Sequence, residues 1–429
     1  MISENLGDFF RGEEMKVIRD PVHGDIAIRS PIAAAVIDHP IFQRLRKISQ
    51  TGLCQYVFPG MKHSRFEHSL GSYHLALQFF DNLYKRYKTN TLYPIQKNTN
   101  DFLIADSMNI WHQIFTNESV TEVWRTNFSL AALLHDIGHG PFSHTFERSG
   151  LLKNFSSHED VSIHYTNIVL KDIGINAQRI QHISALINPK ITENVETASQ
   201  LLSPLISGVI DVDRLDYVSR DAMMAGVNYG RIEIQRTLNI ISPVLYQNSH
   251  TTALLIPEKH FTTIDHYLFS LYQMYTQVYL HPTAVRMEFE LCEILKKAKF
   301  SMPISKEWLK KSGDEDLINA LCKKDKNEVL NILNRSENIP QKSLVQITSL
   351  DLTKESNLRK NGWSQIPSLS RELSKEKGNI FLFLQFDEIT YFTNIEAISL
   401  IVGNSNKFNP SIWCKNNHDK QRKKTKKSA

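Results

Sequence analysis

The sequence predicts a mainly α-helical fold with a short N-terminal β-hairpin and a smaller α+β region at the C-terminal end. Two observations carry this prediction. Between about residues 30 and 300, apolar residues recur at spacings of three and four, as on the buried face of a helix. After about residue 300, β-rich runs such as LVQITSL and NIFLFLQF follow short helical segments. We therefore predict a helical core at 1–300, an α+β lobe at 301–414 and a basic, disordered tail at 415–429.

The first part of the chain predicts a β-hairpin followed by helices. In MKVIRDPVHGDIAIRS (15–30), the β-favouring runs VI and IAI flank the turn-forming sequence DPVHG. Ser30 and Pro31 suit the start of a helix, and SPIAAAVIDHPIFQRLRKISQ then has helical spacing. RFEHSLGSYHLALQFFDNLYKRY and NFSLAALLHDIGH continue this pattern.

The rest of the helical region is less uniform. Residues 88–120 are polar and rich in Asn and Thr, so we expect an insertion there between core helices. A strand-like TALLIP (252–257) precedes a long amphipathic stretch from Lys259 to Phe300. Further helical segments are expected at about 158–173, 178–188, 198–208, 211–224 and 231–240.

Composition is that of an ordinary globular protein. The 429 residues are 41% hydrophobic and 22% charged, which allows a buried pocket. No apolar run approaches the ~20 residues of a membrane span, and the first residues lack a secretory pattern. We therefore expect a cytoplasmic protein that does not enter a membrane. The scattered cysteines are expected to be free thiols: Cys54, Cys292, Cys322 and Cys414.

The net charge of +5 is concentrated at one end of the chain. Residues 415–429 contain seven Lys or Arg and one Asp, so the remainder of the chain sums to −1. This distribution excludes a strongly basic body that wraps nucleic acid. We expect the tail to be solvated, and contact with nucleic acid through the tail is the alternative.

Histidine and aspartate are concentrated in four segments: RFEH (65–68), HDIGHGPFSH (135–144), SHED (157–160) and DVDRLDYVSRD (211–221). His135 and Asp136 follow the apolar run SLAALL, so a buried helix would carry both into the interior. A buried carboxylate is costly unless it is paired or binds a cation. Two histidines and two aspartates would bind a divalent cation and leave positions for water and phosphate. The predicted ligands are His68, His135, Asp136 and Asp213.

The strength of this signal lies in the combination of residues. His68 alone would be weak evidence, because a single helical histidine is more often a hydrogen-bonded core or surface residue than a ligand. The segment HDIGHGPFSH is a stronger signal. It follows an apolar helix and contains three histidines, two glycines and a proline, a combination with no evident role in packing. The donor set suits Mg, Mn, Fe, Co, Ni or Zn.

The same segments carry a resemblance to a known family. IRDPVHGDI, HPIFQRLRKISQTG, YVFPGMKHSRFEHSLG, LLHDIGHGPFSHTFE, HED and DVDRLDYVSRDAMMAG occur in this order between about Val17 and Arg286. In this respect the chain resembles the HD-domain deoxynucleoside triphosphate triphosphohydrolases (dGTPase-like). The likeness is closest to the catalytic domain of the mammalian sterile-alpha-motif HD enzyme and to its bacterial relatives. The resemblance implies an HD-domain helical core within residues 1–300, with an N-terminal nucleotide-activator segment.

The resemblance implies roles for individual residues, and the metal ligands it implies are the four already proposed. The implied active-site residues are His139, His144, His158 and Glu159, the last fixing the tautomer of His158 or raising its pKa. The implied substrate contacts are Arg65, Arg214 and Tyr217 for phosphates, Gln50 and Asp221 for the sugar 3′-hydroxyl, and His281. The implied activator site comprises Lys16, Val17, Asp38, Gln43 and Arg46.

The implied function is metal-dependent hydrolysis of a deoxynucleoside triphosphate (dNTP) to a deoxynucleoside and inorganic triphosphate. In this hypothesis a metal-held water attacks the α-phosphorus, and His144 protonates the departing 5′-oxygen. A nucleotide activator, GTP or a dNTP, is expected to drive or stabilise a homo-oligomer, either a tetramer or a dimer.

Two departures from the family pattern leave the substrate open. Gln277 stands in the place of a phosphate-contacting arginine, and Val285 in that of a tyrosine near the base and sugar. Arginine makes bidentate phosphate contacts that glutamine cannot make. One alternative is therefore an HD phosphohydrolase that acts on another nucleotide or a nucleic-acid end. A second alternative is a nucleotide-sensing regulator with little catalysis.

Overall fold

The computed structural model describes residues 16–93, 101–151, 157–189, 197–246, 251–298 and 306–333, and the short strands 343–345 and 380–382. Over these residues the fold is mainly α-helical with small β-hairpins, which confirms the predicted class. The strands are β1 (Lys16–Asp20), β2 (Gly24–Ile28), β3 (Ser242–Tyr246), β4 (Thr251–Leu255), β5 (Ser343–Val345) and β6 (Ile380–Leu382).

The helices follow one another along the chain with short connections. The N-terminal half contains α2 (Pro31–Asp38), α3 (Pro40–Gln43), η1 (Arg44–Lys47), η2 (Gly52–Tyr56), α4 (Arg65–Lys88), α5 (Asp101–Ile114), α6 (Glu118–Leu134), α7 (His144–Arg148), α8 (His158–Asp172) and α9 (Ala177–Ile187). The remainder contains α10 (Thr197–Leu202), η3 (Ser203–Leu205), α11 (Val212–Ala225), α12 (Ile234–Ile240), η4 (Glu258–His260), α13 (Phe261–Met274), η5 (Tyr275–Tyr279), α14 (Pro282–Ala298), α15 (Lys306–Leu309) and α16 (Asp314–Leu333).

β1 and β2 form the predicted N-terminal hairpin. They pair antiparallel, with Lys16 opposite Ile28. Gly24 begins β2 with a φ of +72°, a left-handed conformation that glycine adopts without strain. Ile26 is fully buried whereas Val17 is 47% exposed, so one face of the hairpin covers the core and the other faces solvent.

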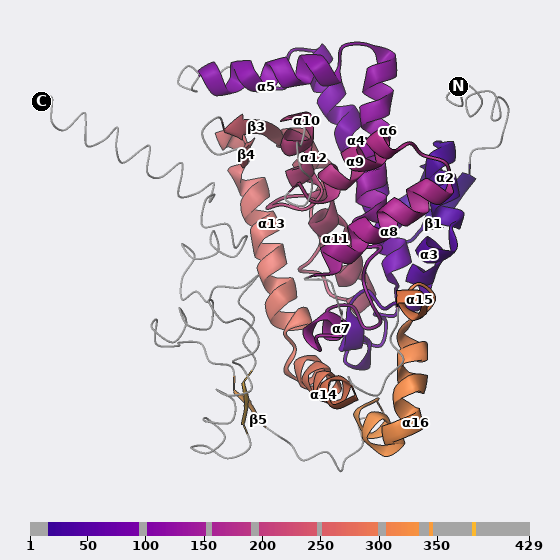
Figure 1. Ribbon diagram of the computed structural model, residues 1–429. Coiled ribbons are helices and arrows are strands. Elements are labelled where there is room, and N and C mark those ends of the chain that lie inside the picture. The colour runs from indigo at the N-terminus through magenta and orange to yellow at the C-terminus, as the bar shows by residue number, and fades with distance from the viewer. Residues whose placement is uncertain are drawn as a thin grey trace, which may run out of the picture.

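The central helices pack around α4, as Figure 1 shows. α4 contacts α6 and α11, and α6 packs on α9. Phe66, Leu70, Tyr73 and Phe80 lie on the buried face of α4, at the spacing of three and four that the sequence displays. In Figure 1, α13 runs along one side of this central group, and α16 lies lower down, near α14.

The prediction of a polar insertion at 88–120 is wrong for the second half of this range. α5 occupies Asp101–Ile114, and α6 begins at Glu118. Trp111, Ile114 and Phe115 are at least 97% buried, because the apolar residues of DFLIADSMNIWHQI (101–114) recur at helical spacing and pack on the core. Residues 94–100 lie outside the described part of the chain.

The long amphipathic stretch predicted from Lys259 to Phe300 is divided into two main helices. α13 ends at Met274, the chain makes one π-helical turn at η5, and Pro282 begins α14. Proline suits the first position of a helix, because its missing N–H would have no helical acceptor there. Single π-turns are often found at functional sites, and this one carries Tyr275 and Tyr279.

Helix α16 packs on the core across the domain boundary predicted near residue 300. It contacts α14, and its Leu317 and Leu321 are buried with Leu53, Phe146 and α14 side chains in a second apolar cluster. β5 and β6 pair in parallel within the two β-rich runs. The rest of the 301–414 lobe and the 415–429 tail lie outside the described residues.

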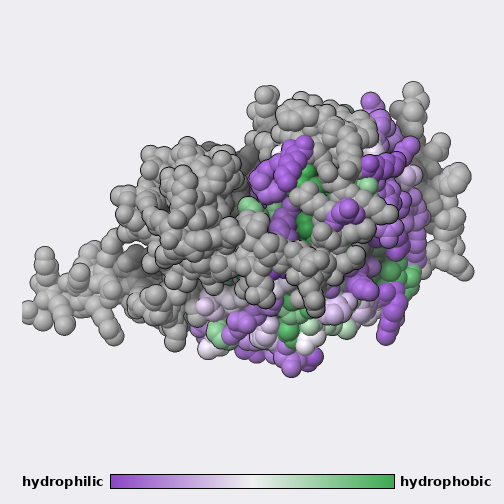
Figure 2. Space-filling view, turned by 90° about the horizontal axis from the view of Figure 1, so that it is seen from below, coloured by the Kyte–Doolittle hydropathy of each residue, from purple (hydrophilic) through white to green (hydrophobic). Residues whose placement is uncertain are grey.

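The cysteines and the surface of the described residues can be compared with the expectations from composition. Cys54, Cys292 and Cys322 are free, and Cys414 lies outside the described part. No helix among the described residues has the length and apolar character needed to span a bilayer. Seen from below, the described surface is largely hydrophilic with small separate hydrophobic patches (Figure 2).

Candidate metal centre and active site

Three helix ends converge to form the candidate metal centre. His68 lies in the first turn of α4, which begins with a capping box. His135 caps the end of α6, and Asp136 follows it. Asp213 lies in the first turn of α11. Because α4 packs against both α6 and α11, residues that are far apart in the sequence meet at one place.

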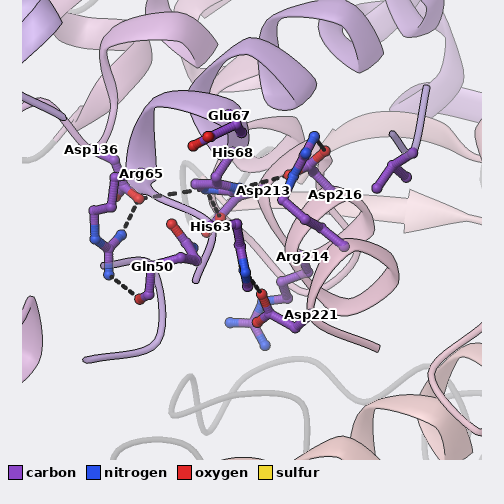
Figure 3. A network of polar contacts seen from close by, with 12 residues as sticks. Gln50, His63, Arg65, Glu67, His68, Asp136, Asp213, Arg214, Asp216 and Asp221 are labelled. Atoms are coloured by element: carbon purple, nitrogen blue, oxygen red, sulfur yellow. Dashed lines mark hydrogen bonds and ion pairs between the residues drawn. The ribbon is translucent and has the colours of Figure 1, made fainter. Parts of the chain in front are cut away.

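The side-chain atoms of these four residues face one another at short range. His68 Nε2 lies 3.1 Å from Asp213 Oδ1 and 3.4 Å from Asp136 Oδ2. His135 Nε2 lies 3.4 Å from Asp136 Oδ1 and 3.5 Å from Asp213 Oδ1. Figure 3 shows His68 between Asp136 and Asp213. The structure thus brings all four predicted ligands into one cluster.

The hydrogen bonding of this cluster suits a divalent cation. Nε2 of His68 and Nε2 of His135 are buried and make no hydrogen bond, although carboxylate oxygens lie near them. The other ring nitrogens are used: Nδ1 of His68 bonds Asp216, and Nδ1 of His135 donates to the carbonyl of Ala132. A buried polar atom without a partner is costly. Two imidazoles and two carboxylates oriented in this way match the donor set of a divalent metal.

Arg65 supplies a buried positive charge beside this cluster. Its guanidinium bonds Asp136 Oδ2, donates from Nε to Ser143 Oγ at 2.7 Å and from Nη2 to the carbonyl of Gln50 at 3.4 Å. Burial alone would raise the pKa of Asp136, but the charge of Arg65 and the neighbouring histidines hold that pKa well below its usual range. Asp136 is therefore ionised, as a cation ligand must be.

Three histidines form a second cluster next to the first. The rings of His139 and His158 stack with centroids 4.0 Å apart, and His144 meets them edge-on at 5.0 and 5.4 Å. Nitrogen atoms from all three rings lie within 4.8 Å of one another. His139 Nε2 lies 3.4 Å from Asp136 Oδ1, which joins the two clusters.

Glu147 is the carboxylate that serves the histidine cluster, and the sequence analysis did not assign it. Its Oε2 lies 2.9 Å from Nδ1 of His158 and 3.4 Å from Nδ1 of His144. Burial would lower the pKa of His158, but the bond to Glu147 raises that pKa above its usual value. The residue expected in this place, Glu159, is exposed and accepts a hydrogen bond from Asn188 at 3.0 Å. The available signal was the spacing of three between His144 and Glu147 on one helix.

Both clusters open into one cavity of about 240 Å³. The expected site residues that line it are Gln50, Arg65, Asp136, His139, His144, His158, Glu159, Asp213, Arg214, Tyr217 and Asp221. The other lining residues include Cys54, Arg148, Tyr275, Tyr279 and Glu288. Three guanidinium groups, those of Arg65, Arg148 and Arg214, thus border a cavity that Asp136 and Asp213 of the candidate metal centre also line.

The residues that line this cavity do not include His68 and His135, nor three positions of the expected substrate site. His281 Nδ1 accepts a hydrogen bond from the N–H of Thr283 at 3.3 Å, and its ring meets Phe58 edge-on at 5.8 Å. Gln277 is exposed on the π-helical turn, and Val285 is 3% exposed. The structure therefore does not bring His281 into contact with the cavity.

Asp221 is fixed at the cavity by two residues that the sequence analysis missed. Its Oδ1 lies 2.6 Å from Nε2 of His63, and its Oδ2 accepts a hydrogen bond from the hydroxyl of Tyr279 at 2.7 Å. Figure 3 shows His63 directed at Asp221. Nearby on the cavity wall, the Oε1 atom of Gln50 is buried without a hydrogen-bond partner. A hydroxyl-bearing ligand would satisfy such an oxygen.

The loop that carries Ser143 has an unusual backbone. Phe142 and Ser143 have φ values of +55° and +52°, which cost free energy in residues other than glycine. Asp314, at the start of α16, accepts hydrogen bonds from the N–H of Phe142 at 2.6 Å and of Ser49 at 2.9 Å. Helix α16 therefore holds this loop beside Arg65.

The five expected activator residues make contacts on the surface near the hairpin. Lys16 Nζ pairs with Asp38 Oδ1 at 2.6 Å, and Arg46 Nε donates to Gln43 Oε1 at 2.9 Å. Val17 is exposed. Their assignment to a nucleotide activator stays a prediction.

Comparison with known proteins identifies the central region. Residues 65–221 match the protein family described as "HD domain". The uncharacterized protein YwfO of Bacillus subtilis is 34% identical over 289 residues, 67% of this chain and 56% of that protein. A deoxynucleoside triphosphate triphosphohydrolase SAMHD1 homolog of Dictyostelium discoideum is 29% identical over 70% of this chain and 53% of that protein. The chain spans about half the length of these curated relatives.

Solved structures give a consistent picture of the fold. A phosphohydrolase from Bacteroides thetaiotaomicron has a TM-score of 0.53 and 26% identity, covering 85% of this chain and 84% of that one. A hypothetical protein from Aquifex aeolicus has a TM-score of 0.55 and 26% identity, covering 83% and 84%. The matched segment begins at Arg65 and ends at Asp221, so it contains all four residues of the candidate metal centre. The chain therefore carries an HD domain over residues 65–221.

Proposed function

We propose that this protein is a metal-dependent HD-domain phosphohydrolase that cleaves dNTPs to a deoxynucleoside and inorganic triphosphate. The observation that carries the proposal is one cavity lined by Asp136 and Asp213 of the metal centre, by the histidine cluster and by three arginines. Relatives named as dNTP triphosphohydrolases support the choice of substrate. All the catalytic and substrate residues implied by that likeness, except His281, line the same cavity.

The side chains of the cavity divide into groups with different tasks. A divalent cation bound by His68, His135, Asp136 and Asp213 would polarise a phosphate oxygen and lower the pKa of water. Arg214 and Arg148 line the cavity and would bind the anionic phosphates. Gln50 and Asp221 would orient the sugar, with Asp221 held by its two partners.

The histidine cluster would manage the proton that the leaving 5′-oxygen needs. His144 is the proposed donor, since its side chain is 49% exposed and lines the cavity. Glu147 contacts both His144 and His158, so it orients the two imidazoles together. In this arrangement His158 and Glu147 position the donor, and they can share the proton with it.

Regulation is part of the proposal. Lys16, Val17, Asp38, Gln43 and Arg46 would bind a nucleotide activator, GTP or a dNTP, and the activated form would be a homo-oligomer. Sedimentation velocity with and without GTP and each dNTP tests this part separately. An unchanged sedimentation coefficient in every mixture would contradict it.

The test of the function is product analysis with single nucleotides. Purified protein is incubated with each dNTP, alone and with GTP, in the presence of Mn²⁺ or Mg²⁺, and products are separated by ion-exchange chromatography. We expect a deoxynucleoside and triphosphate in equal amounts. The His135→Ala variant is the inactive control. Release of pyrophosphate or orthophosphate, or no cleavage of any dNTP, would contradict the proposal.

A second substrate class is favoured by one observation. Position 277 carries Gln where the family pattern would supply an arginine for the triphosphate. Gln277 is also exposed and does not line the cavity. A nucleoside monophosphate or a nucleic-acid end needs fewer phosphate contacts. Including dNMPs and a 5′-phosphorylated oligonucleotide in the same assay distinguishes these substrates.

A further inference from the structure

Asp216 is a fully buried carboxylate that contacts a proposed metal ligand but does not line the cavity. It lies on α11, three residues after Asp213, and its Oδ2 is 2.8 Å from Nδ1 of His68. The side chains of both residues are 0% exposed. A carboxylate in the protein interior needs several partners to offset the loss of hydration.

The contact with Asp216 determines which nitrogen of His68 can bind a cation. An ionised carboxylate only accepts hydrogen bonds, so Nδ1 of His68 must carry the hydrogen. The lone pair of the neutral ring is then on Nε2, the atom that faces Asp213 and Asp136. Asp216 therefore orients the ring and fixes the tautomer that a metal ligand requires.

Arg220 and His23 hold Asp216 in this position. Arg220 donates from Nε to Asp216 Oδ2 and from Nη2 to Asp216 Oδ1, both at 2.9 Å. His23 Nε2 lies 2.6 Å from Asp216 Oδ1. Arg220 is one turn further along α11, but His23 comes from the turn of the N-terminal hairpin, 193 residues away in the sequence.

Asp20, at the end of β1, completes the network. Its Oδ2 accepts a hydrogen bond from Arg220 Nη1 at 2.7 Å. Its Oδ1 accepts hydrogen bonds from the backbone N–H groups of Val22 and His23 at 2.9 and 2.8 Å, which shapes the turn that presents His23. The side chain of Asp20 is 3% exposed and that of Arg220 is 0% exposed, so water does not replace these bonds.

Helix α4 leaves space for this network at Gly71. A Cβ atom at this position would lie 1.8 Å from Asp216 Oδ1 and 2.5 Å from Arg220 Nη2. Asp216 Oδ1 is bonded to both Arg220 Nη2 and His23 Nε2, so a larger side chain at this position would disturb these bonds. The helix that carries His68 thus approaches the Asp216–Arg220 pair as closely as a glycine permits.

We propose that His23 and Asp20 are positioning residues of the metal centre, so that the N-terminal hairpin sets the affinity of the protein for a divalent cation. The hairpin acts through Asp216 and Arg220 on the metal ligand His68. This proposal rests on the proposed metal centre and deepens it.

The test measures Mn²⁺ binding to the metal-stripped full chain by isothermal titration calorimetry. His23→Ala removes one hydrogen bond to Asp216. We expect it to weaken Mn²⁺ binding about tenfold, as is typical when a residue that supports a metal ligand is lost. His23→Gln can donate from a nitrogen in a similar place, so it should restore binding to within about threefold of wild type. Asp20→Asn loses the charge that pairs with Arg220 and is expected to weaken binding about fivefold.

The matched control is Asp25→Asn on the same hairpin. Asp25 pairs with Arg19 at 2.7 Å, and both side chains are more than 60% exposed, so Mn²⁺ affinity should not change. Circular dichroism establishes that each variant is folded. Folded His23→Ala with wild-type affinity would overturn the proposal, as would equal weakening by Asp25→Asn. If His23→Ala does not fold, wild-type affinity in folded Asp20→Asn overturns it instead.

The outcomes separate this proposal from the proposed function. Wild-type protein that binds no Mn²⁺ would show that the metal centre itself is absent. Wild-type protein that binds Mn²⁺ but whose affinity is the same in all hairpin variants would remove only the role of the hairpin. Neither result depends on which nucleotide the protein hydrolyses.

Discussion

Glu147 Oε2 lies 2.9 Å from His158 Nδ1, and this contact joins the short helix α7 to the first turn of α8. The same carboxylate oxygen lies 3.4 Å from His144 Nδ1, so one glutamate organises two of the three clustered histidines. Opposite charge on Glu147 raises the pKa of His158, and the two histidines lower the pKa of Glu147 against the effect of burial.

Replacing Glu147 by Gln should change stability in a pH-dependent way. Since the pKa of His158 is raised in the folded protein, its protonation stabilises the fold below the unfolded pKa of about 6.5. This stabilisation is lost as the pH rises through the higher folded pKa. Urea unfolding should therefore show a larger destabilisation of Glu147→Gln at pH 6 than at pH 9. An equal loss at both pH values would contradict the assignment.

Replacing His135 by Ala should abolish tight metal binding. His135 Nε2 has no hydrogen bond and faces two carboxylates, so its loss removes a donor from the centre. We expect metal affinity to fall by more than about 100-fold. This is more than is expected for replacing a residue that only hydrogen-bonds to a ligand. Elemental analysis after dialysis measures this. His266→Ala, an exposed histidine on α13, is the control and should retain its metal.

Replacing Asp314 by Ala should destabilise the loop around Ser143. The buried N–H of Phe142 and the partly buried N–H of Ser49 would lose their acceptor, which costs about 2 kcal/mol or more in the free energy of unfolding. The catalytic rate should also fall, because Ser143 accepts the bond from Arg65 Nε. Urea unfolding and kcat are the measurements. Glu315→Ala, an exposed neighbour, should behave as wild type.

Replacing Tyr279 by Phe should weaken substrate binding more than catalysis. The hydroxyl of Tyr279 donates to Asp221, the residue proposed to read the sugar. Without it, we expect KM for the dNTP to rise about fivefold, which corresponds to about 1 kcal/mol for one hydrogen bond. Steady-state kinetics on Tyr279→Phe, with Tyr229→Phe as control, measure the effect. A fall in kcat at constant KM would contradict a sugar-binding role for Asp221.

Local sequence pattern was sufficient to predict most of the helices and the N-terminal hairpin. It failed for α5 and for the break between α13 and α14. The hairpin, α4 and α6 follow from turn chemistry and helical spacing, which are properties of neighbouring residues. α5 was missed because polar residues rich in Asn and Thr flank it, although its own sequence, DFLIADSMNIWHQI, has apolar residues at helical spacing. The break between α13 and α14 at Tyr275–Tyr279 was also missed, although Pro282 in the sequence marks the start of α14.

Some residues of the candidate site could be predicted from the sequence, and others could not. His135 and Asp136 are adjacent in the sequence, and the residue types of the four His- and Asp-rich segments are sufficient to indicate metal chemistry. Glu147 was missed because Glu159 is adjacent to His158 in the sequence, whereas the fold turns α7 so that Glu147 meets the imidazole. His281, expected at the substrate, lies away from the cavity because its ring packs on Phe58.

The sequence by itself determined the helical class, the hairpin and the kinds of side chain available for chemistry. Only the tertiary structure decided which of those side chains meet. Asp20 and His23 contact Arg220 and Asp216 across about 200 residues of chain, and Asp314 reaches Phe142 from α16. Such contacts depend on how helices pack and on the need to pair buried charges, and no periodicity in the sequence encodes them.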